Sequence, residues 1–340
     1  MNVIYNFARR AVVFDLPSFS TVSQKKINLC ALCASSEAGG EIIYNKMEKE
    51  SNTTVLVQKP KWLRRRLPTG SEYEKVKGMI SDDRLHTVCQ EAKCPNMWEC
   101  FSQKTATFLI MGSRCTRNCR FCSVLPGPLE PPDPAEPARV ADVAHQMGLK
   151  YVVVTSVTRD DVADGGASLF ARTITEIRRK MADACVEVLI PDFQGNRDAL
   201  HTVLKARPDV LNHNIETVPR LYPRVRPQAE YQRSLDIIRW AHEFDSALPT
   251  KSGLMLGLGE EELEVENTLK DLQSAGCRIL TLGQYLQPSK NHLPVARFIP
   301  PEDFEAWRKK AIKIGFSEVA SGPFVRSSYH AQELYQEVSA

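Results

Sequence analysis

Six short runs of branched and aromatic residues alternate with longer stretches of helical periodicity between residues 105 and 315. Strands separated by helices form parallel sheets, because each helix returns the chain to the same edge of the sheet. The expected strands are 105–112, 151–157, 186–193, 209–216, 252–258 and 278–286. The expected helices are 138–148, 167–183, 197–206, 231–244, 261–276 and 301–315. This alternation predicts an α/β fold, a partial (β/α)6 barrel of the TIM type, with reactive groups at the carboxyl ends of the strands.

Six of the ten cysteines lie between residues 89 and 122. They form two triplets, Cys89, Cys94 and Cys100 in CQEAKCPNMWEC, and Cys115, Cys119 and Cys122 in CTRNCRFC. No secretory pattern is present, so we expect a reducing compartment in which clustered thiols bind metal. Structural zinc sites use four protein ligands, whereas three thiolates leave one iron of a four-iron cluster open. Two triplets suggest two clusters, and the alternative is a non-catalytic zinc or iron–sulfur protein.

The other four cysteines receive no metal-binding role. Cys185 and Cys277 lie in or beside apolar strands and are interpreted as buried small residues. Cys30 and Cys33 have the spacing of a redox or zinc pair, but they lie in an N-terminal stretch whose own role is open.

The second triplet directly follows the first expected strand, where a barrel of this type keeps its active site. Polar segments end the other strands, at 155–167, 191–196, 212–222, 257–260 and 285–294. Each segment alone is typical of a capped turn, but five beside one thiol loop favour a pocket. His213 is expected to be a hydrogen-bonded core histidine. No side chain is predicted to act as a catalytic acid or base.

The chain is expected to divide into four parts: a poorly structured leader over 1–57, an N-terminal extension over 58–104, the barrel over 105–315 and a C-terminal segment over 316–340. Residues 1–46 are either a weak transit peptide or a stretch upstream of a true start at Met47. We expect a cytoplasmic protein, or a mitochondrial or plastid one if these residues are a transit peptide.

Charge and hydropathy exclude two kinds of partner. Lysine and arginine number 44 against 41 aspartates and glutamates, and a net charge of +3 predicts no nucleic-acid partner. No run of about eighteen apolar residues is present, so we expect no membrane-spanning helix.

The loop Cys-x3-Cys-x2-Cys, with Phe121 before its last cysteine, resembles the signature of radical S-adenosylmethionine enzymes. This resemblance implies that Cys115, Cys119 and Cys122 bind a 4Fe–4S cluster whose open iron is chelated by S-adenosylmethionine. Reductive cleavage of that cofactor then gives a 5′-deoxyadenosyl radical. Asn118 stands where the family has glycine, and asparagine tolerates the left-handed conformation that glycine permits.

From about Lys59 to Ala331 the chain resembles the lipoyl synthase family, through TVCQEAKCPNMWECF, TSVTRDDVADGGA, NHNIETVPRLY, TKSGLMLGLGE and ASGPFVRSSYHA among other segments. The resemblance implies that the extensions carry the ligands of an auxiliary 4Fe–4S cluster: Cys89, Cys94, Cys100 and a serine of RSSY, with Ser328 preferred over Ser327. It implies insertion of two sulfur atoms at C6 and C8 of a protein-bound octanoyl group. Two S-adenosylmethionine molecules are spent, and the auxiliary cluster is the sulfur source. Another radical sulfur-inserting enzyme is the nearest alternative.

The same resemblance implies binding residues and partners. S-Adenosylmethionine and substrate are expected to contact Arg159, Asp160, Asp161, Asn212, Asn214 and Glu216. The implied partners are octanoylated lipoyl carrier proteins, of the lipoyl-domain and glycine cleavage H protein types, and an electron donor such as flavodoxin or ferredoxin. The basic stretch from Lys59 to Arg66 is interpreted either as a solvated arm with one aromatic anchor or as a segment that attracts an acidic carrier.

Overall fold

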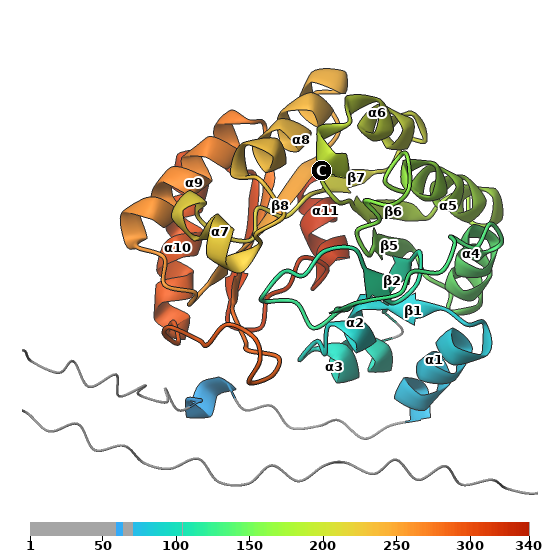
Figure 1. Ribbon diagram of the computed structural model, residues 1–340, viewed down its shortest axis with the longest axis horizontal. Helices are drawn as coiled ribbons and strands as arrows, with labels where there is room; N and C mark the ends of the chain where they lie inside the picture. The colour runs from blue at the N-terminus through green and yellow to red at the C-terminus, as the bar shows by residue number, and fades with distance from the viewer. Residues whose placement is uncertain (1–58, 64–70, 104, 340) are drawn as a thin grey trace, which may run out of the picture. The chain divides into compact units, whose positions relative to one another are not determined.

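All six expected strands are present in the computed structural model and lie side by side in one parallel sheet (Figure 1). They are β2 (Thr107–Ile110), β5 (Tyr151–Ser156), β6 (Cys185–Leu189), β7 (Val210–Asn212), β8 (Thr250–Leu256) and β9 (Ile279–Gln284). Each strand pairs with the next one along the chain. The expected partial (β/α)6 barrel is therefore confirmed, with strands shorter than expected at several ends.

The structure describes residues 59–63, 71–103 and 105–339. All of them belong to one compact unit, Val55–Ala340. Residues 1–57, with Cys30, Cys33 and Met47, lie outside the described residues, as do the arginines at 64–66.

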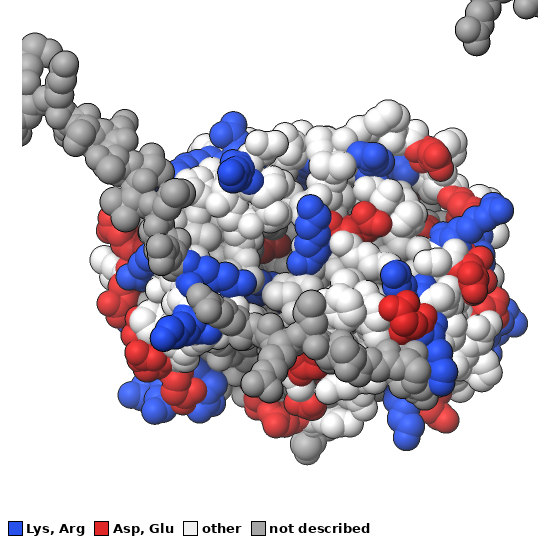
Figure 2. Space-filling model, turned by 90° about the horizontal axis from the view of Figure 1, so that it is seen from below, with Lys and Arg blue, Asp and Glu red and all other residues white. Residues whose placement is uncertain are grey.

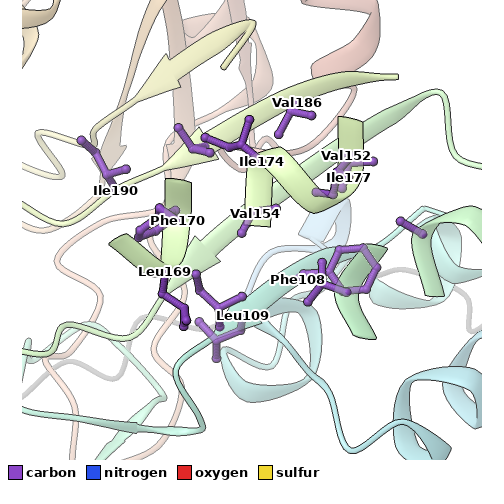
Figure 3. Close-up of a cluster of buried hydrophobic side chains, with 14 of the residues drawn as sticks. Phe108, Leu109, Val152, Val154, Leu169, Phe170, Ile174, Ile177, Val186 and Ile190 are labelled. Carbon is purple, nitrogen blue, oxygen red and sulfur yellow. The ribbon is translucent and has the colours of Figure 1, made fainter. Parts of the chain in front are cut away.

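The six expected helices are also present and pack on the outer face of the sheet (Figure 1). They are α4 (Glu136–Gln146), α5 (Ala167–Lys180), α6 (Arg197–Lys205), α8 (Tyr231–Phe244), α9 (Glu262–Ser274) and α10 (Pro301–Ile314). Figure 3 shows how α5 is seated, with Phe170 and Ile174 against Val152, Val154 and other buried side chains of the neighbouring strands. Parallel strands covered in this way are apolar on both faces.

The sheet is wider than the sequence pattern indicates. β1 (His86–Thr87) pairs antiparallel with β2, and β10 (Glu318–Gly322) pairs parallel with β9, which gives eight strands within the described residues. A second small sheet joins β3 (Arg114–Cys115) to β4 (Leu125–Pro126). The C-terminal segment expected at 316–340 thus begins inside the sheet.

Apart from β1, the regular elements in the described part of the N-terminal extension are helices. It contains the short 3-10 helix η1 (Lys61–Leu63) and the helices α1 (Ser71–Asp82), α2 (Val88–Glu91) and α3 (Met97–Ser102). The ring of Tyr73 in α1 stacks on Trp98 in α3, with 4.2 Å between centroids, and also lies 5.6 Å from Phe101. This aromatic contact fixes α3 against α1.

The chain ends inside the curve of the sheet. Tyr151 and Val153 alternate with the outward-facing residues of β5 and form a small buried cluster with Ala331 of α11 (Ala331–Ser339). Tyr335 of α11 lies 5.8 Å from Tyr151, ring to ring. The C-terminal helix therefore packs on the inner face of the sheet, as Figure 1 also shows.

Three short helices complete the described residues: η2 (Phe193–Gly195), η3 (Pro219–Leu221) and α7 (Tyr222–Val225). Within the described part of the chain, every helix is too short or too polar to span a membrane. The face in Figure 2 carries basic and acidic side chains interspersed, in keeping with the nearly balanced composition.

Candidate cluster and cofactor site

The loop after β2 carries the second cysteine triplet at the carboxyl end of the parallel sheet. Backbone hydrogen bonds join it to the loops after β5, β7 and β9: Thr116 N donates to Thr158 O at 3.0 Å, Arg120 N to Val225 O at 2.9 Å and Leu293 N to Arg120 O at 3.2 Å. The triplet therefore lies among the polar strand ends, as the sequence predicts.

The side chain of Arg117 fixes this cysteine loop. Its Nε and Nη2 donate to Asp160 at 2.7 and 2.8 Å, and its Nη1 and Nη2 donate to Asp192 at 3.0 and 2.6 Å. Asp160 follows β5 and Asp192 follows β6, so one guanidinium ties the loop to two strand ends. Burial alone would raise the pKa of each carboxyl, but hydrogen bonds from Arg117 hold both pKa values below the ordinary range.

The first triplet lies in the N-terminal extension. Cys89 is in α2, Cys94 is in the turn that follows, and Cys100 is in α3. Cys94 N donates to Cys89 O at 3.0 Å. Burial is the main cause that raises the pKa of the Cys89 thiol to about 12, and the charge of Cys94 contributes to this rise. The first triplet thus comes from two short helices and the turn between them.

The segment ASGPFVRSSYHA, residues 320–331, is called the C-terminal motif. It lies beside this first triplet. Asn96 Nδ2 donates to Phe324 O at 2.7 Å, and the Tyr329 hydroxyl donates to Glu99 Oε1 at 3.0 Å. Asn96 and Glu99 both stand between Cys94 and Cys100 in the sequence. Two segments more than two hundred residues apart are thereby brought together at the expected auxiliary site.

Asn214 and Glu216, two of the expected binding residues, lie next to each other beyond β7. Asn214 Nδ2 donates to Glu216 Oε1 at 3.1 Å, and Arg226 Nη1 donates to Asn214 O at 3.0 Å. Burial raises the pKa of Glu216, and Arg226 opposes this rise. The Nε of Arg226 is buried and has no hydrogen-bond partner among the described residues, so this donor is available to a ligand.

Asn212 is fully buried at the end of β7. Its Nδ2 donates to Glu187 Oε1 at 2.9 Å, and Lys251 Nζ donates to both oxygens of Glu187 at 3.1 Å. The Oδ1 of Asn212 has no partner among the described residues. Since Glu187 accepts from Nδ2, the amide orientation is determined and Oδ1 is the acceptor that a ligand would meet.

The remaining expected binding residues form a second group after β5. Arg159 donates to the two oxygens of Asp161 at 2.8 and 2.7 Å, while Asp160 is held by Arg117. Asp160 and Asp161 line a pocket of about 360 Å³, together with Phe193, Gln194 and Asn196. Both carboxylates are thus already paired with arginines.

Comparison with known proteins decides the family. Two family models match: the radical SAM superfamily over residues 109–272, and the N-terminal domain of lipoyl synthase of the radical SAM family over residues 35–94. The lipoyl synthase of Desulfotalea psychrophila is 56% identical over 288 residues, which is 85% of this chain and 96% of that protein. The chain belongs to the lipoyl synthase family. The lipoyl synthase of Rubrobacter xylanophilus is 55% identical over 279 residues, covering 82% of this chain and 87% of the relative.

A solved structure supports the fold alone. The structure of Streptococcus suis SuiB bound to S-adenosylmethionine aligns with a TM-score of 0.51 at 10% identity. The alignment covers 66% of this chain and about half of SuiB, 54%. The two chains therefore share a fold at low sequence identity.

The donor set fits the 4Fe–4S clusters of the lipoyl synthase family. The six cysteines of the two triplets are thiols in the structure, with no disulfide among them. Burial is the main cause that raises the pKa of Cys122 to about 12, and the charges of Cys119 and Cys115 contribute to this rise. Arg117 N also donates to Cys115 Sγ at 3.4 Å, as amides around cluster sulfurs do.

Within the described ranges, no three His, Cys, Asp or Glu side chains converge as the ligands of a single metal ion do.

Three residues of this lipoyl synthase site were missed from the sequence: Arg117, Asp192 and Arg226. The presence of Arg117 inside the cysteine loop was the only local signal, because its partners lie 43 and 75 residues away. Of the minor predictions, His213 is confirmed as a core histidine, since it is buried and its Nδ1 donates to Ile190 O at 2.9 Å. Cys277 is buried as expected, whereas the prediction for Cys185 is wrong: it is only half-buried, because it is the first residue of β6.

Proposed function

We propose that this member of the lipoyl synthase family inserts two sulfur atoms, at C6 and C8, into an octanoyl group carried on a lysine of a carrier protein. One observation carries the proposal: the C-terminal motif lies beside the first cysteine triplet, joined by Asn96 to Phe324 and by Glu99 to Tyr329. In a sulfur-inserting enzyme with a second cluster, this contact brings the serine of the motif to the cysteines of that cluster. A radical enzyme with one cluster does not need such a contact.

The ligand assignment follows the two triplets. We assign Cys115, Cys119 and Cys122 to the cluster that binds S-adenosylmethionine, and Cys89, Cys94, Cys100 and Ser328 to the auxiliary cluster. Ser328 is preferred to Ser327 because the Ser327 hydroxyl already donates to Asn214 Oδ1 at 2.9 Å. A hard oxygen ligand on iron otherwise held by sulfur is ill matched, which suits a cluster that gives up sulfur.

The chemistry explains why no catalytic acid or base is needed. The C–H bonds at C6 and C8 have no useful acidity, so no side chain removes their protons at working pH. When bound, the clusters and S-adenosylmethionine supply the radical that removes each hydrogen and the sulfur that replaces it. The protein's own contribution is to position these groups and exclude water.

Two groups of residues have different parts in this proposal. Asn212, Asn214 and Glu216 contact S-adenosylmethionine or substrate through the polar atoms at the end of β7. Arg159, Asp160 and Asp161 shape the part of the site that follows β5, and Asp160 acts through Arg117 on the cysteine loop.

Membership of the family implies a lipoyl carrier as substrate. We propose lipoyl domains and glycine cleavage H proteins as carriers, flavodoxin or ferredoxin as the electron donor, and the cytoplasm as the compartment. Lys59 and Lys61 are exposed and support a role for the basic stretch in attracting an acidic carrier.

The experiment that tests the ligand assignment compares two variants after anaerobic reconstitution. Wild-type protein is expected to hold about eight irons, as two four-iron clusters. Cys115→Ala is expected to abolish S-adenosylmethionine cleavage, measured as 5′-deoxyadenosine. Cys94→Ala is expected to retain some cleavage and lose all sulfur insertion. Cys277→Ala, outside both triplets, is the control for loss of a buried thiol.

Two results contradict the proposal. Colourless protein with stoichiometric zinc favours a structural zinc protein, and equal loss of both activities in the two cysteine variants removes the division of labour.

A further inference from the structure

A side-chain hydrogen bond joins the C-terminal motif to the expected cofactor residues. Ser327 Oγ donates to Asn214 Oδ1 at 2.9 Å, across 113 residues of sequence. Asn214 Nδ2 donates in turn to Glu216 Oε1, which fixes the orientation of the amide. Ser327, Asn214 and Glu216 therefore form a connected chain of polar groups.

Two glycines make room for this contact inside the sheet. A Cβ atom at Gly253 in β8 would lie 2.8 Å from Asn214 Oδ1 and 3.1 Å from Ser327 Oγ. A Cβ atom at Gly283 in β9 would lie 2.3 Å from Val325 O. The motif thus runs against bare backbone on two neighbouring strands, and its position there is closely defined.

The other side of the motif is tied to the auxiliary site. Phe324 O accepts from Asn96, and the Tyr329 hydroxyl donates to Glu99. Ser328, the proposed auxiliary ligand, stands between Ser327 and Tyr329. A shift of Ser328 toward or away from its iron therefore acts on both neighbours, one held by Asn214 and the other by the extension.

We propose that Ser327 is a positioning residue that couples the two sites, so that S-adenosylmethionine binds more tightly when the auxiliary site is occupied. The inference rests on the proposed function, because it takes Ser328 as a cluster ligand and Asn214 as a cofactor contact. Occupation of the auxiliary site fixes Ser328, this fixes Ser327, and Ser327 holds the Asn214 amide in its binding orientation. Coupling of this kind is reciprocal, so bound S-adenosylmethionine also favours ligation of the auxiliary cluster.

The test is a double-mutant cycle with the dissociation constant of S-adenosylmethionine as its readout. Equilibrium dialysis is performed on reconstituted wild-type protein, Ser327→Ala, Cys94→Ala, which removes the auxiliary cluster, and the double variant. Ser327→Ala is expected to weaken binding about fivefold in protein with both clusters, the size of one hydrogen bond. In the Cys94→Ala background the same change is expected to have almost no effect.

Matched variants separate coupling from a general structural effect. Ser321→Ala removes another hydroxyl of the same segment, one that donates to Phe304 O at 2.7 Å, and is expected to leave the dissociation constant unchanged. Ser327→Thr and Ser327→Val have nearly the same volume, and only threonine keeps the hydroxyl. Threonine is expected to bind like wild type and valine like alanine, and this pair answers the question even if the alanine variant does not fold.

Two outcomes overturn the inference while the proposed function stands. One is unchanged binding in Ser327→Ala, and the other is the same weakening with and without the auxiliary cluster. Wild-type protein that binds no S-adenosylmethionine contradicts the proposed function itself, and the coupling with it.

Discussion

Arg117 shows how one side chain determines the shape of the cysteine loop. Its guanidinium and the Asp192 carboxylate are almost completely buried, with side-chain exposures of 4% and 0%. Without Arg117, the ion pair left to buried Asp192 is the longer contact to Arg233 Nη1 at 3.4 Å, and breaking a buried pair typically destabilises by about 3–5 kcal/mol. We therefore predict that Arg117→Ala lowers the free energy of unfolding by about this amount and loosens the loop that holds Cys115, Cys119 and Cys122.

Denaturant unfolding and iron analysis measure this prediction. The control is Arg220→Ala, which removes an exposed pair with Glu264 and is expected to change little. An Arg117→Ala protein with wild-type stability and full iron would show that the two aspartates do not hold the loop.

His213 gives a prediction about pH. Burial lowers its pKa to about 4, with Arg226 adding to the effect and Asp192 opposing it. Between about pH 6.5 and pH 4 the unfolded chain binds a proton that folded His213 refuses, so stability must fall as pH drops through this window. The loss is expected to reach about 3 kcal/mol near pH 4.

Replacing the ring removes this loss. In His213→Asn the free energy of unfolding is expected to depend less on pH between 7 and about 4.5 than in wild type, whereas the exposed His145→Asn keeps the wild-type dependence. Equal pH dependence in wild type and His213→Asn would refute the assignment.

For single residues, the sequence predicts the chemical role of a side chain better than it predicts which residues that side chain contacts. The six cysteines are predictable because their spacing is local, and His213 is predictable because a lone histidine is more often a hydrogen-bonded core residue than a ligand. Asp192 as a partner of Arg117 is not, since an aspartate after a strand is equally typical of a turn, as its own hydrogen bond to Gln194 N shows. The same limit applies to Ser327 and Asn214, whose contact depends on the path of the whole chain.

At the scale of the elements, strand β9 packs closely against the C-terminal motif because residue 283 is a glycine. The backbone at Gly283 suits alanine, so the obstacle to substitution is the Val325 carbonyl oxygen, which would lie 2.3 Å from an added Cβ atom. Gly283→Ala is expected to push the C-terminal motif away, lower the free energy of unfolding by about 1–3 kcal/mol and reduce bound iron from about eight to about four per chain.

A second glycine is the control for Gly283→Ala. Gly78 in α1 has open space around its Cβ position, so Gly78→Ala is expected to stabilise by about 0.5–1 kcal/mol and to leave bound iron unchanged. Full iron in Gly283→Ala would show that the motif does not need this close approach.

Whether a helix or strand can be predicted from the sequence depends on how long its residue pattern is. The six helices and six strands of the barrel were predictable because branched runs and helical periodicity repeat over a long stretch of chain. β1 has two residues, and β10 contains a serine and ends at glycine, so neither has a strand signature of its own. β10 is a strand because β9 offers it an edge, with five residues in register.

At the scale of the whole molecule, the C-terminal motif contacts two distant segments. It meets the extension through Asn96 and Glu99, and it meets the end of β7 through the bond of Ser327 to Asn214. The sequence pattern alone accounts for the barrel and for the cysteine loop after β2. The contacts of the motif join residues more than one hundred positions apart, so no local pattern indicates them.

Sulfur insertion by the whole molecule is measured by mass spectrometry of an octanoylated carrier. The carrier is incubated anaerobically with reconstituted protein, reductant and S-adenosylmethionine, and 5′-deoxyadenosine is measured in the same sample. We expect a carrier that gains two sulfur atoms, with two molecules of 5′-deoxyadenosine formed for each octanoyl group converted. Formation of 5′-deoxyadenosine with no sulfur gained by the carrier would contradict the proposed function.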